Sequence, residues 1–365
     1  MKVLFLSENY YNDEYANITG SIYQSYLIAK FLSQKGFKII YASFSKIPRN
    51  FKENDNFEVY LLKEKNNIFL NFFEILKFIR NLEFDLVYTR GRSYLLFVAS
   101  LTKKPYVFNS NAQEGLRRFK HISKLFYSKR NFLKKILLFI PFLMLDFLVQ
   151  IGIKNSTLII VQNEFQKEEA KKIWKRNAFI IPNLQIRVEN YPRKGEKIVI
   201  WIGQITRWKN PQLFIEIAKK LKKYKFLMIG YGDLNLIKGY EKVENLEFLG
   251  KLKNEEINRI LEKSWIILNT SEGEGIPNVI IQAMMRGNVP ICLNDDFSIL
   301  EKYKVGFKVK NLNEMIEKII LLFENENLFF DYSKRAFEFS NNYFDYEKNG
   351  NLYYQYFLEI FSKNS

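Results

Sequence analysis

The 365-residue sequence contains a single cysteine, Cys292. One thiol excludes an internal disulfide and any metal site built from several cysteines, which fits a reducing compartment, so we expect the protein in the cytoplasm. A secretory signal is not evident either. The short apolar run at residues 2–7 is soon followed by acids and is typical of a first strand.

Long apolar runs are also scarce. The most apolar stretch, residues 136–153, contains Pro141 and Asp146. A membrane-spanning helix needs about 20 consecutive, predominantly apolar residues. We therefore interpret this stretch as a buried or interfacial helix.

Positive charge, by contrast, is in excess, with a net value of +17 that is concentrated in the first half of the chain. Residues 1–187 hold 30 Lys and Arg against 15 Asp and Glu, whereas residues 188–365 hold 26 against 24. Positions 103–135 carry ten basic residues and one acid, Glu114, directly before the apolar stretch. Basic residues beside an apolar helix are attracted to anionic membranes by about 1 kcal/mol each. A solvated basic helix explains the same pattern equally well.

The length of the chain predicts two domains, and an apolar fraction of 47% is sufficient for two packed cores. Short apolar runs alternate with amphipathic helical stretches, a pattern typical of parallel sheets with helices on both faces. Strands are expected at 2–7, 37–43, 84–90, 104–111, 156–163 and 177–183, and again at 197–203, 225–232, 246–250, 265–271 and 288–294. The fold class is therefore α/β, with two doubly wound Rossmann-like domains.

A polar segment at 184–197 separates the two sets of strands. We expect residues 1–187 to form the first domain and residues 188–344 the second, with an aromatic-rich helix at 345–365 packing back on the first. Doubly wound sheets bind ligands at the carboxyl ends of their strands, so the ligand site is expected in a cleft between the two domains.

The segment "EGIPNVIIQAMMRG", residues 274–287, leads from a strand of the second domain into a helix. Pro277 is expected in the first helical turn, where its missing N–H costs nothing. The backbone amides expected at this helix start are those of Gly275, Ile276, Asn278 and Val279. With the positive end of the helix dipole they form a phosphate site, while Glu274 is a strong acceptor for hydroxyl groups. A phosphate site beside a hydroxyl acceptor predicts a sugar nucleotide.

A second motif, "GQITRWKNP" at 203–211, follows the first strand of the second domain and opens its helix. It places Arg207 and Lys209 at the mouth of the expected cleft. Two cations there would neutralise a diphosphate and stabilise the charge that develops as the sugar bond breaks. Simple solvation of the loop is the alternative for this motif alone, and the helix start at Pro277 favours the diphosphate.

The sequence resembles the retaining glycosyltransferases of family 4, which have the GT-B fold. The matching motifs are "TGS" at 19–21, "IIVQNEFQKEEAKK", "IIPN", "IGQITRWKNPQLFIEIAKKL", "MIGYGD" and the block from "LEFLGKLKNEEINRI" to "EGEGIPNVIIQAMMRGNVPI". The resemblance covers nearly the whole chain and is most specific in the second domain. It implies a nucleotide-diphosphate sugar on the second domain, an acceptor on the first, and no metal or other cofactor. Asp295 and Asp296 are interpreted as a loop feature rather than a metal-binding D-x-D motif.

The same resemblance implies roles for individual residues. The expected catalytic residues are Glu274, Lys209 and Arg207, and the expected donor-binding residues are Gly20, Gly203, Arg207, Lys209, Gly250, Lys251, Leu252, Glu274, Gly275, Ile276, Pro277, Asn278, Val279 and Gln282. Lys209 would hold the diphosphate, Glu274 the hydroxyls of the sugar, and Gln282 the ribose. Residues 248–252 would line the base through backbone groups, and Gly20 would let its loop approach the phosphates.

Three positions depart from the family pattern. Gln282 stands where the family has a second glutamate, and a neutral acceptor is weaker by about 1 kcal/mol. Gln204 replaces an arginine after the loop glycine, so Arg207 is expected to substitute for it. Asn111 falls where the first domain commonly has a histidine or an arginine.

Asn111, His121 and Arg92 are the residues expected on the acceptor side. His121 is the only histidine of the sequence, but it lies in the basic stretch "RRFKHISKLF" beyond the expected strand end. A structural role is therefore favoured over a role as catalytic base. Retention needs no dedicated base if the leaving diphosphate takes the proton of the acceptor.

We predict a retaining glycosyltransferase that adds a hexose or N-acetylhexosamine to a glycan, on a polyprenyl-diphosphate or other lipid carrier, in the synthesis of lipopolysaccharide, capsule or another surface polysaccharide. The protein is expected to be peripheral on the inner face of the cell membrane. A non-catalytic GT-B partner protein and a nucleotide-sugar epimerase are the alternatives. Nucleic acid is not an expected partner, because basic residues interleaved with exposed aromatics are not evident.

Overall fold

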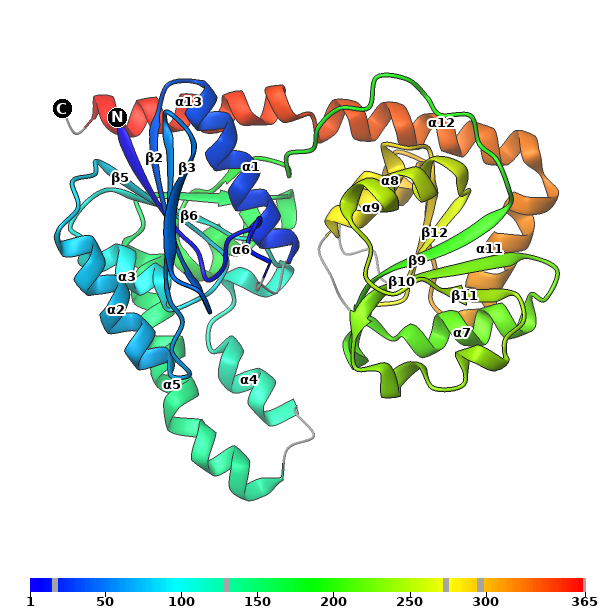
Figure 1. Ribbon diagram of the computed structural model, residues 1–365, viewed down its shortest axis with the longest axis horizontal. Helices are drawn as coiled ribbons and strands as arrows, with labels where there is room; N and C mark the ends of the chain where they lie inside the picture. The colour runs from blue at the N-terminus through cyan, green and yellow to red at the C-terminus, as the bar shows by residue number, and fades with distance from the viewer. Residues whose placement is uncertain (15–18, 128–130, 272–275, 294–298, 364–365) are drawn as a thin grey trace. The chain divides into compact units, whose positions relative to one another are not determined.

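The structure, a computed structural model, describes residues 1–14, 19–127, 131–271, 276–293 and 299–363. The chain forms two compact units (Figure 1). Unit 1 comprises Met1–Leu184 and Glu347–Ser365, and unit 2 comprises Gln185–Tyr346. The first segment of unit 1 ends at Leu184, three residues before the boundary expected at residue 187. The helix expected at 345–365 is α13 (Tyr346–Ser362), nearly all of which belongs to unit 1.

Unit 1 is built on an eight-stranded sheet with the order β3-β4-β2-β1-β5-β6-β7-β8. Its strands are β1 (Lys2–Leu6), β2 (Lys38–Ser45), β3 (Arg49–Asn54), β4 (Phe57–Lys63), β5 (Leu86–Arg90), β6 (Tyr106–Asn109), β7 (Leu158–Val161) and β8 (Phe179–Ile180). Every neighbouring pair is parallel except β3 and β4. Neither strand of this hairpin was predicted. β3, "RNFKEN", is an exposed edge strand with few apolar residues, and β4, "FEVYLLK", alternates between buried and less buried positions.

Helices cover both faces of this sheet. They are α1 (Gly20–Gln34), α2 (Ile68–Arg80), α3 (Leu95–Leu101), α4 (Lys120–Tyr127), α5 (Phe132–Asn155), α6 (Glu164–Trp174) and α13, with a 3-10 turn η1 (Gln113–Leu116). Helices α2, α3 and α5 share one apolar core with the sheet. On the other face Tyr353 of α13 packs against Tyr88 of β5, and Gly350 lies so close to Phe31 of α1 that an added Cβ would be 2.5 Å from its ring. α13 therefore completes the core of unit 1.

Helix α5 differs from the expectation for residues 136–153. It is longer, and Pro141 lies inside it without ending it. Among the described residues, α5 is the one helix that is long and apolar enough to cross a membrane, by length and composition only. Only 22% of its most apolar window is buried. Its buried residues are Asp146, Val149, Gly152 and Ile153. The second half of α5 thus contributes to the core. The first half is exposed, so the expectation of a buried helix is wrong there, and the alternative of an interfacial helix stays a prediction.

Unit 2 contains a six-stranded parallel sheet with the order β11-β10-β9-β12-β13-β14. The strands are β9 (Ile198–Ile205), β10 (Lys225–Gly232), β11 (Leu246–Phe248), β12 (Ile266–Asn269), β13 (Val289–Cys292) and β14 (Phe307–Lys308). The helices are α7 (Pro211–Lys220), α8 (Asn254–Lys263), α9 (Asn278–Met284), α10 (Ile299–Lys302), α11 (Leu312–Glu324) and α12 (Glu326–Tyr343), with 3-10 turns η2 (Arg207–Lys209), η3 (Leu234–Ile237) and η4 (Tyr240–Lys242). Two apolar cores lie on the two faces of the sheet. The prediction of an α/β fold with two doubly wound domains is confirmed.

Candidate functional site

Both sheets contain a point at which the strand order reverses direction. In unit 1 β1 lies between β2 and β5, and in unit 2 β9 lies between β10 and β12. Loops that follow the two central strands at such a point leave in opposite directions, and the crevice between them is where doubly wound sheets bind ligands. In unit 2 these loops begin at Thr206 and at Thr270, and they are the two segments that the sequence predicts for the diphosphate.

The loop after β9 does not run straight into the helix. Arg207–Lys209 form the 3-10 turn η2, Asn210 adopts a left-handed conformation with φ 49°, and α7 begins at Pro211. Arg207 is exposed and Lys209 is half-buried. The Nζ of Lys209 lies 4.6 Å from the ring centroid of Trp208. Both cations therefore belong to a compact turn at the carboxyl edge of the sheet, as the motif predicts.

Thr270, the residue after β12, fastens this turn. Its Oγ1 donates a hydrogen bond of 2.7 Å to the carbonyl oxygen of Lys209 and accepts one of 2.9 Å from Nε1 of Trp201. Trp201 is a core residue of β9 with 2% exposure. Thr270 therefore links the loop after β12 both to the loop after β9 and to the core of the sheet. The sequence analysis missed Thr270. A hydroxyl residue directly after an apolar strand was the available signal.

Glycines allow close approach at the ends of β9, β10 and β11. An added Cβ on Gly203 would lie 3.2 Å from the Trp201 ring, and one on Gly230 would lie 2.0 Å from the Gly203 carbonyl oxygen. Gly250 has a φ of 67°, and its carbonyl oxygen accepts a hydrogen bond of 2.8 Å from the amide of Gly230. A side chain at Gly230 would therefore push β9 and β10 apart.

The start of α9 differs from the expectation in one respect. The helix begins at Asn278, and Pro277 is its N-cap, not a residue of the first turn. The carbonyl oxygen of Pro277 accepts hydrogen bonds from the amides of Ile280 and Ile281, of 3.0 and 3.2 Å. The backbone of Pro277 is extended, with ψ 139°, so this residue precedes the helix and does not belong to its first turn. Of the motif, Glu274 and Gly275 lie outside the described residues.

Three other predicted donor-binding residues are held by apolar packing. Leu252, Ile276 and Val279 are partly buried against the same core of unit 2. Lys251 extends its Nζ over the ring of Tyr231 at 5.1 Å. The Nε2 of Gln282 donates a hydrogen bond of 3.2 Å to Oδ1 of Asn254. The side-chain oxygen Oε1 of Gln282 is therefore the atom that a ribose contact would use.

In unit 1 the predicted acceptor-side residues do not form one cluster. Arg92 and His121 meet at a carboxylate that the sequence analysis did not include, that of Asp146 on α5. Oδ1 of Asp146 lies 2.7 Å from Nη2 of Arg92 and 2.8 Å from Nδ1 of His121. The backbone amides of His121 and Ile122 also donate to this carboxylate. Asn111, which lies against Gly91, is not part of this group.

Asp146 is fully buried, and the side chain of Arg92 is 6% exposed. Burial raises the pKa of Asp146, but the hydrogen bonds from His121, Ile122 and Arg92 outweigh this effect and lower it to about 2. Burial lowers the pKa of Arg92, and Asp146 opposes that shift. The hub of Arg92, Asp146 and His121 thus cross-links the loop after β5 to α4 and α5. The sequence analysis missed Asp146 because it considered this residue only as an interruption of an apolar stretch.

A second polar network lies under the carboxyl ends of the unit 1 strands. Arg90 donates to Oδ1 of Asn183 at 2.7 Å, and Gln162 donates to the same oxygen. Asn109 donates to the hydroxyl groups of Tyr88 and Tyr353. These residues fix the strand ends and α13, which is a structural role.

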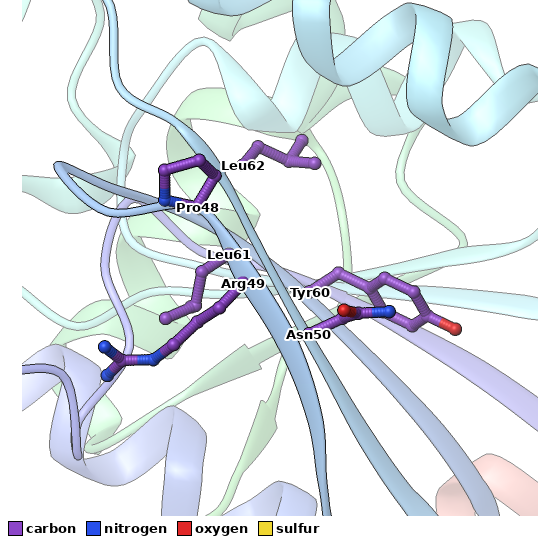
Figure 2. A pocket seen from close by; sticks show the side chains of 6 residues that line it. All are labelled: Pro48, Arg49, Asn50, Tyr60, Leu61 and Leu62. Carbon is purple, nitrogen blue, oxygen red and sulfur yellow. The ribbon is translucent and has the colours of Figure 1, made fainter.

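A shallow cavity of about 310 Å³ lies at the edge of unit 1. Its lining residues are Pro48, Arg49, Asn50, Tyr60, Leu61 and Leu62, of which Figure 2 shows the side chains. The lining includes none of the predicted site residues. Arg49 pairs instead with the buried carboxylate of Asp13, at 3.3 Å.

Within the described part of the chain, no group of three or more His, Cys, Asp or Glu side chains is arranged to hold a metal ion. Asp295 and Asp296 lie outside that part. Gly20 is the first residue of α1 in unit 1, and the loop that precedes α1 follows the carboxyl end of β1.

Comparisons with known proteins bear on the family and the fold of the chain. Residues 183–339 match the family described as Glycosyl transferases group 1. The chain is 23% identical over 305 residues to the N,N'-diacetylbacillosaminyl-diphospho-undecaprenol alpha-1,3-N-acetylgalactosaminyltransferase of Campylobacter jejuni, with 73% of this chain and 75% of that protein covered. Matches to other curated glycosyltransferases are shorter and span 26% to 57% of their length.

Solved structures give the same fold over nearly the whole chain. Sucrose-phosphate synthase from Thermosynechococcus elongatus aligns with a TM-score of 0.77 at 14% identity, covering 99% of both chains. HepE from Anabaena, in complex with UDP-glucose, aligns with a TM-score of 0.69 at 12% identity, covering 98% of this chain and 100% of that one. At such identities the likeness establishes the fold, which is GT-B. The family match within unit 2 and the shared fold together support a GT-B glycosyltransferase.

Proposed function

We propose that this protein is a retaining glycosyltransferase of the family 4 type. It transfers a hexose or N-acetylhexosamine from a nucleotide-diphosphate sugar to a glycan acceptor without a metal ion. The observation that carries the proposal is the point in the unit 2 sheet, between β9 and β12, at which the strand order reverses. There the turn with Arg207 and Lys209 is fastened to the β12 loop by Thr270, within the segment that matches the glycosyl transferase family.

In this proposal Lys209 and Arg207 neutralise the diphosphate of the donor. They become more important as the bond to the sugar breaks, because negative charge then accumulates on the leaving group. Glu274 accepts hydrogen bonds from the donor sugar, and Gln282 from the ribose. The leaving diphosphate takes the proton of the attacking acceptor hydroxyl. A uridine nucleotide is the first donor to test, because the Anabaena neighbour was solved with UDP-glucose.

The proposed acceptor is a glycan on a polyprenyl-diphosphate or similar lipid carrier, in surface polysaccharide synthesis. The Campylobacter relative is named for an undecaprenol-linked substrate, and the basic residues of this chain are concentrated before position 188. We place the protein in the cytoplasm, peripheral on the inner face of the membrane, where such carriers are anchored.

Thermal unfolding with a panel of nucleotide sugars tests the donor site. A donor present at 100 times its dissociation constant stabilises the folded protein by about 2.7 kcal/mol. We expect one nucleotide to raise the melting temperature, and nucleoside diphosphate to be released only when acceptor is added. Conversion of the donor to an isomeric sugar without acceptor would identify an epimerase, and no stabilisation by any donor would contradict the proposal.

The position of Gln282 makes a further prediction about donor affinity. Gln282→Glu is expected to lower the dissociation constant of the donor several-fold, because a carboxylate is a stronger hydroxyl acceptor by about 1 kcal/mol. Titration calorimetry measures the change. Gln355→Glu, at an exposed position of α13 in unit 1, is a control that should leave the constant unchanged. Unaltered affinity of Gln282→Glu would remove this residue from the ribose site.

A further inference from the structure

The first half of α5 exposes an unusual number of large apolar side chains. Those more than half exposed are Phe132, Leu133, Ile136, Leu137 and Ile140, with exposures from 54% to 76%, and Phe126 of α4 adds a further 60%. They share one face of the helix, because at 3.6 residues per turn positions 132, 133, 136, 137 and 140 fall within an arc of about 140°. Contiguous exposed apolar surface of this kind marks an interaction site.

The charge around this surface has one sign. Residues 117–127 and 131–155, which we call the α4–α5 hairpin, contain seven Lys and Arg and a single acid, Asp146. Asp146 is buried and paired with Arg92, so the hairpin offers no carboxylate to a partner. Lys135 also holds the hairpin together, because its Nζ donates a hydrogen bond of 2.8 Å to the carbonyl oxygen of Phe126.

The hairpin is anchored in unit 1 from Asp146 onward. Gly152 lies against Leu96 of α3 so closely that an added Cβ would be 2.6 Å from its side chain. The part of α5 before Asp146 is about 21 Å long at 1.5 Å per residue, which is short of the hydrocarbon core of about 30 Å. Crossing the membrane with the whole of α5 would place the Asp146 carboxylate in hydrocarbon and break its bonds to Arg92 and His121.

We propose that the α4–α5 hairpin inserts its apolar tip into one leaflet of an anionic bilayer, while its basic residues contact the lipid headgroups. Figure 1 shows the hairpin projecting from the rest of unit 1. The hub of Arg92, Asp146 and His121 fixes α4 to the loop after β5, which lies at the carboxyl edge of the sheet. The hub therefore links the inserted hairpin to this edge of the sheet. Delivery of a lipid-linked glycan to that edge rests on the proposed function; insertion itself does not.

A bilayer fits these features better than a second copy of the chain. Two hairpins packed against one another would bring together two sets of seven basic residues without an exposed acid among the described residues of the hairpin, and like charges at an interface oppose association. Anionic headgroups satisfy the same residues, and acyl chains cover the apolar tip.

Sedimentation with lipid vesicles tests this inference on the full-length protein. Wild type should bind vesicles of 30 mol% phosphatidylglycerol in phosphatidylcholine, and bind pure phosphatidylcholine much more weakly. The double variant Leu137→Glu/Ile140→Glu should bind at least about tenfold more weakly, because two carboxylates oppose insertion. Leu321→Glu, at an exposed position of α11 in unit 2, is the matched control and should bind like wild type. Equal binding by the double variant would overturn the proposal.

A tryptophan probe measures the depth of insertion. In Leu137→Trp, lipids brominated along the acyl chain should quench the added fluorescence, whereas a probe at Leu321 should not be quenched. Protein that resists alkaline extraction like an integral membrane protein would show spanning and would overturn insertion into a single leaflet. Dimers that dissociate in the double variant, without any vesicle binding by wild type, would identify an interface between copies instead.

Donor-induced thermal stabilisation of the same variants separates the two proposals. The double variant should keep its melting temperature and its response to nucleotide sugars, because the tip is remote in sequence from unit 2. Loss of vesicle binding with a normal donor response supports membrane insertion independently of catalysis. Normal vesicle binding without any donor response would refute the proposed function but would still support membrane insertion of the hairpin.

Discussion

Replacing Lys209 by alanine is expected to lower the rate of sugar transfer by about 10²–10³-fold, the usual cost of removing one group that stabilises developing charge. Thr270 donates a hydrogen bond of 2.7 Å to the backbone carbonyl oxygen of Lys209, so the turn that carries this lysine is fixed before the donor arrives. The loss should appear mainly in kcat, because the charge on the diphosphate is greatest in the transition state. Initial rates of nucleoside diphosphate release in the presence of acceptor measure the effect.

Two further variants make this result specific. Lys220→Ala, at an exposed position near the end of α7, removes an equal charge and should retain the wild-type rate. Thr270→Val should give an intermediate loss, since Lys209 remains but its turn is no longer fastened. An activity of Lys209→Ala within twofold of wild type would exclude the diphosphate role. Wild-type protein that is inactive with every donor would favour a non-catalytic partner protein.

Asp146→Asn is expected to destabilise unit 1 by about 3–5 kcal/mol, the usual cost of breaking a buried ion pair by removing one partner. The variant leaves the guanidinium of Arg92 buried without its counter-charge and weakens the bonds to the first turn of α4. Hydrogen exchange should therefore increase most in residues 115–127. Asp331→Asn removes an exposed partner of Arg335 on α12 and should change stability by less than about 1 kcal/mol.

The same carboxylate predicts a dependence on acidity. The folded pKa of Asp146 is about 2, below its ordinary value of 3.8. Its contribution to stability is therefore complete above pH 4 and is lost as the pH falls from about 4 toward 2. The difference in unfolding free energy between wild type and Asp146→Asn should shrink over this interval in urea titrations. A difference that stays constant down to pH 3 would show that Asp146 is not held ionised by the hub.

Apolar runs that end in polar residues predicted most strands of the two sheets, but not β3, β4 or β14. β3 could not be recognised in this way, because an exposed edge strand does not need apolar residues. β4 alternates between buried and less buried positions and is not one continuous apolar run, and β14 has only two residues. The predicted start of α9 was wrong by one residue, since a proline that precedes a helix and one in its first turn have the same local sequence pattern. Helix boundaries depend on backbone contacts that periodicity does not report.

The contacts that organise the site lie far apart in the sequence. Thr270 and Lys209 are 61 residues apart, and Arg92 and Asp146 are 54 residues apart. No local pattern links such pairs, so the sequence predicted Lys209, Arg92 and His121 as single residues without the groups that hold them. His121 illustrates the difference. Its Nδ1 bonds to the buried Asp146, which agrees with the structural role favoured for it.

The position of α13 has a consequence for the order in which the protein matures. Tyr353 and Phe357, which are fully buried, belong to a unit whose other residues end at Leu184. During synthesis, the face of the sheet that α13 covers therefore stays open while all of unit 2 is translated, although domains usually fold in order from the N-terminus. Unit 2 is contiguous and can complete its core first. Unit 1 consequently completes its core only after α13 has left the ribosome.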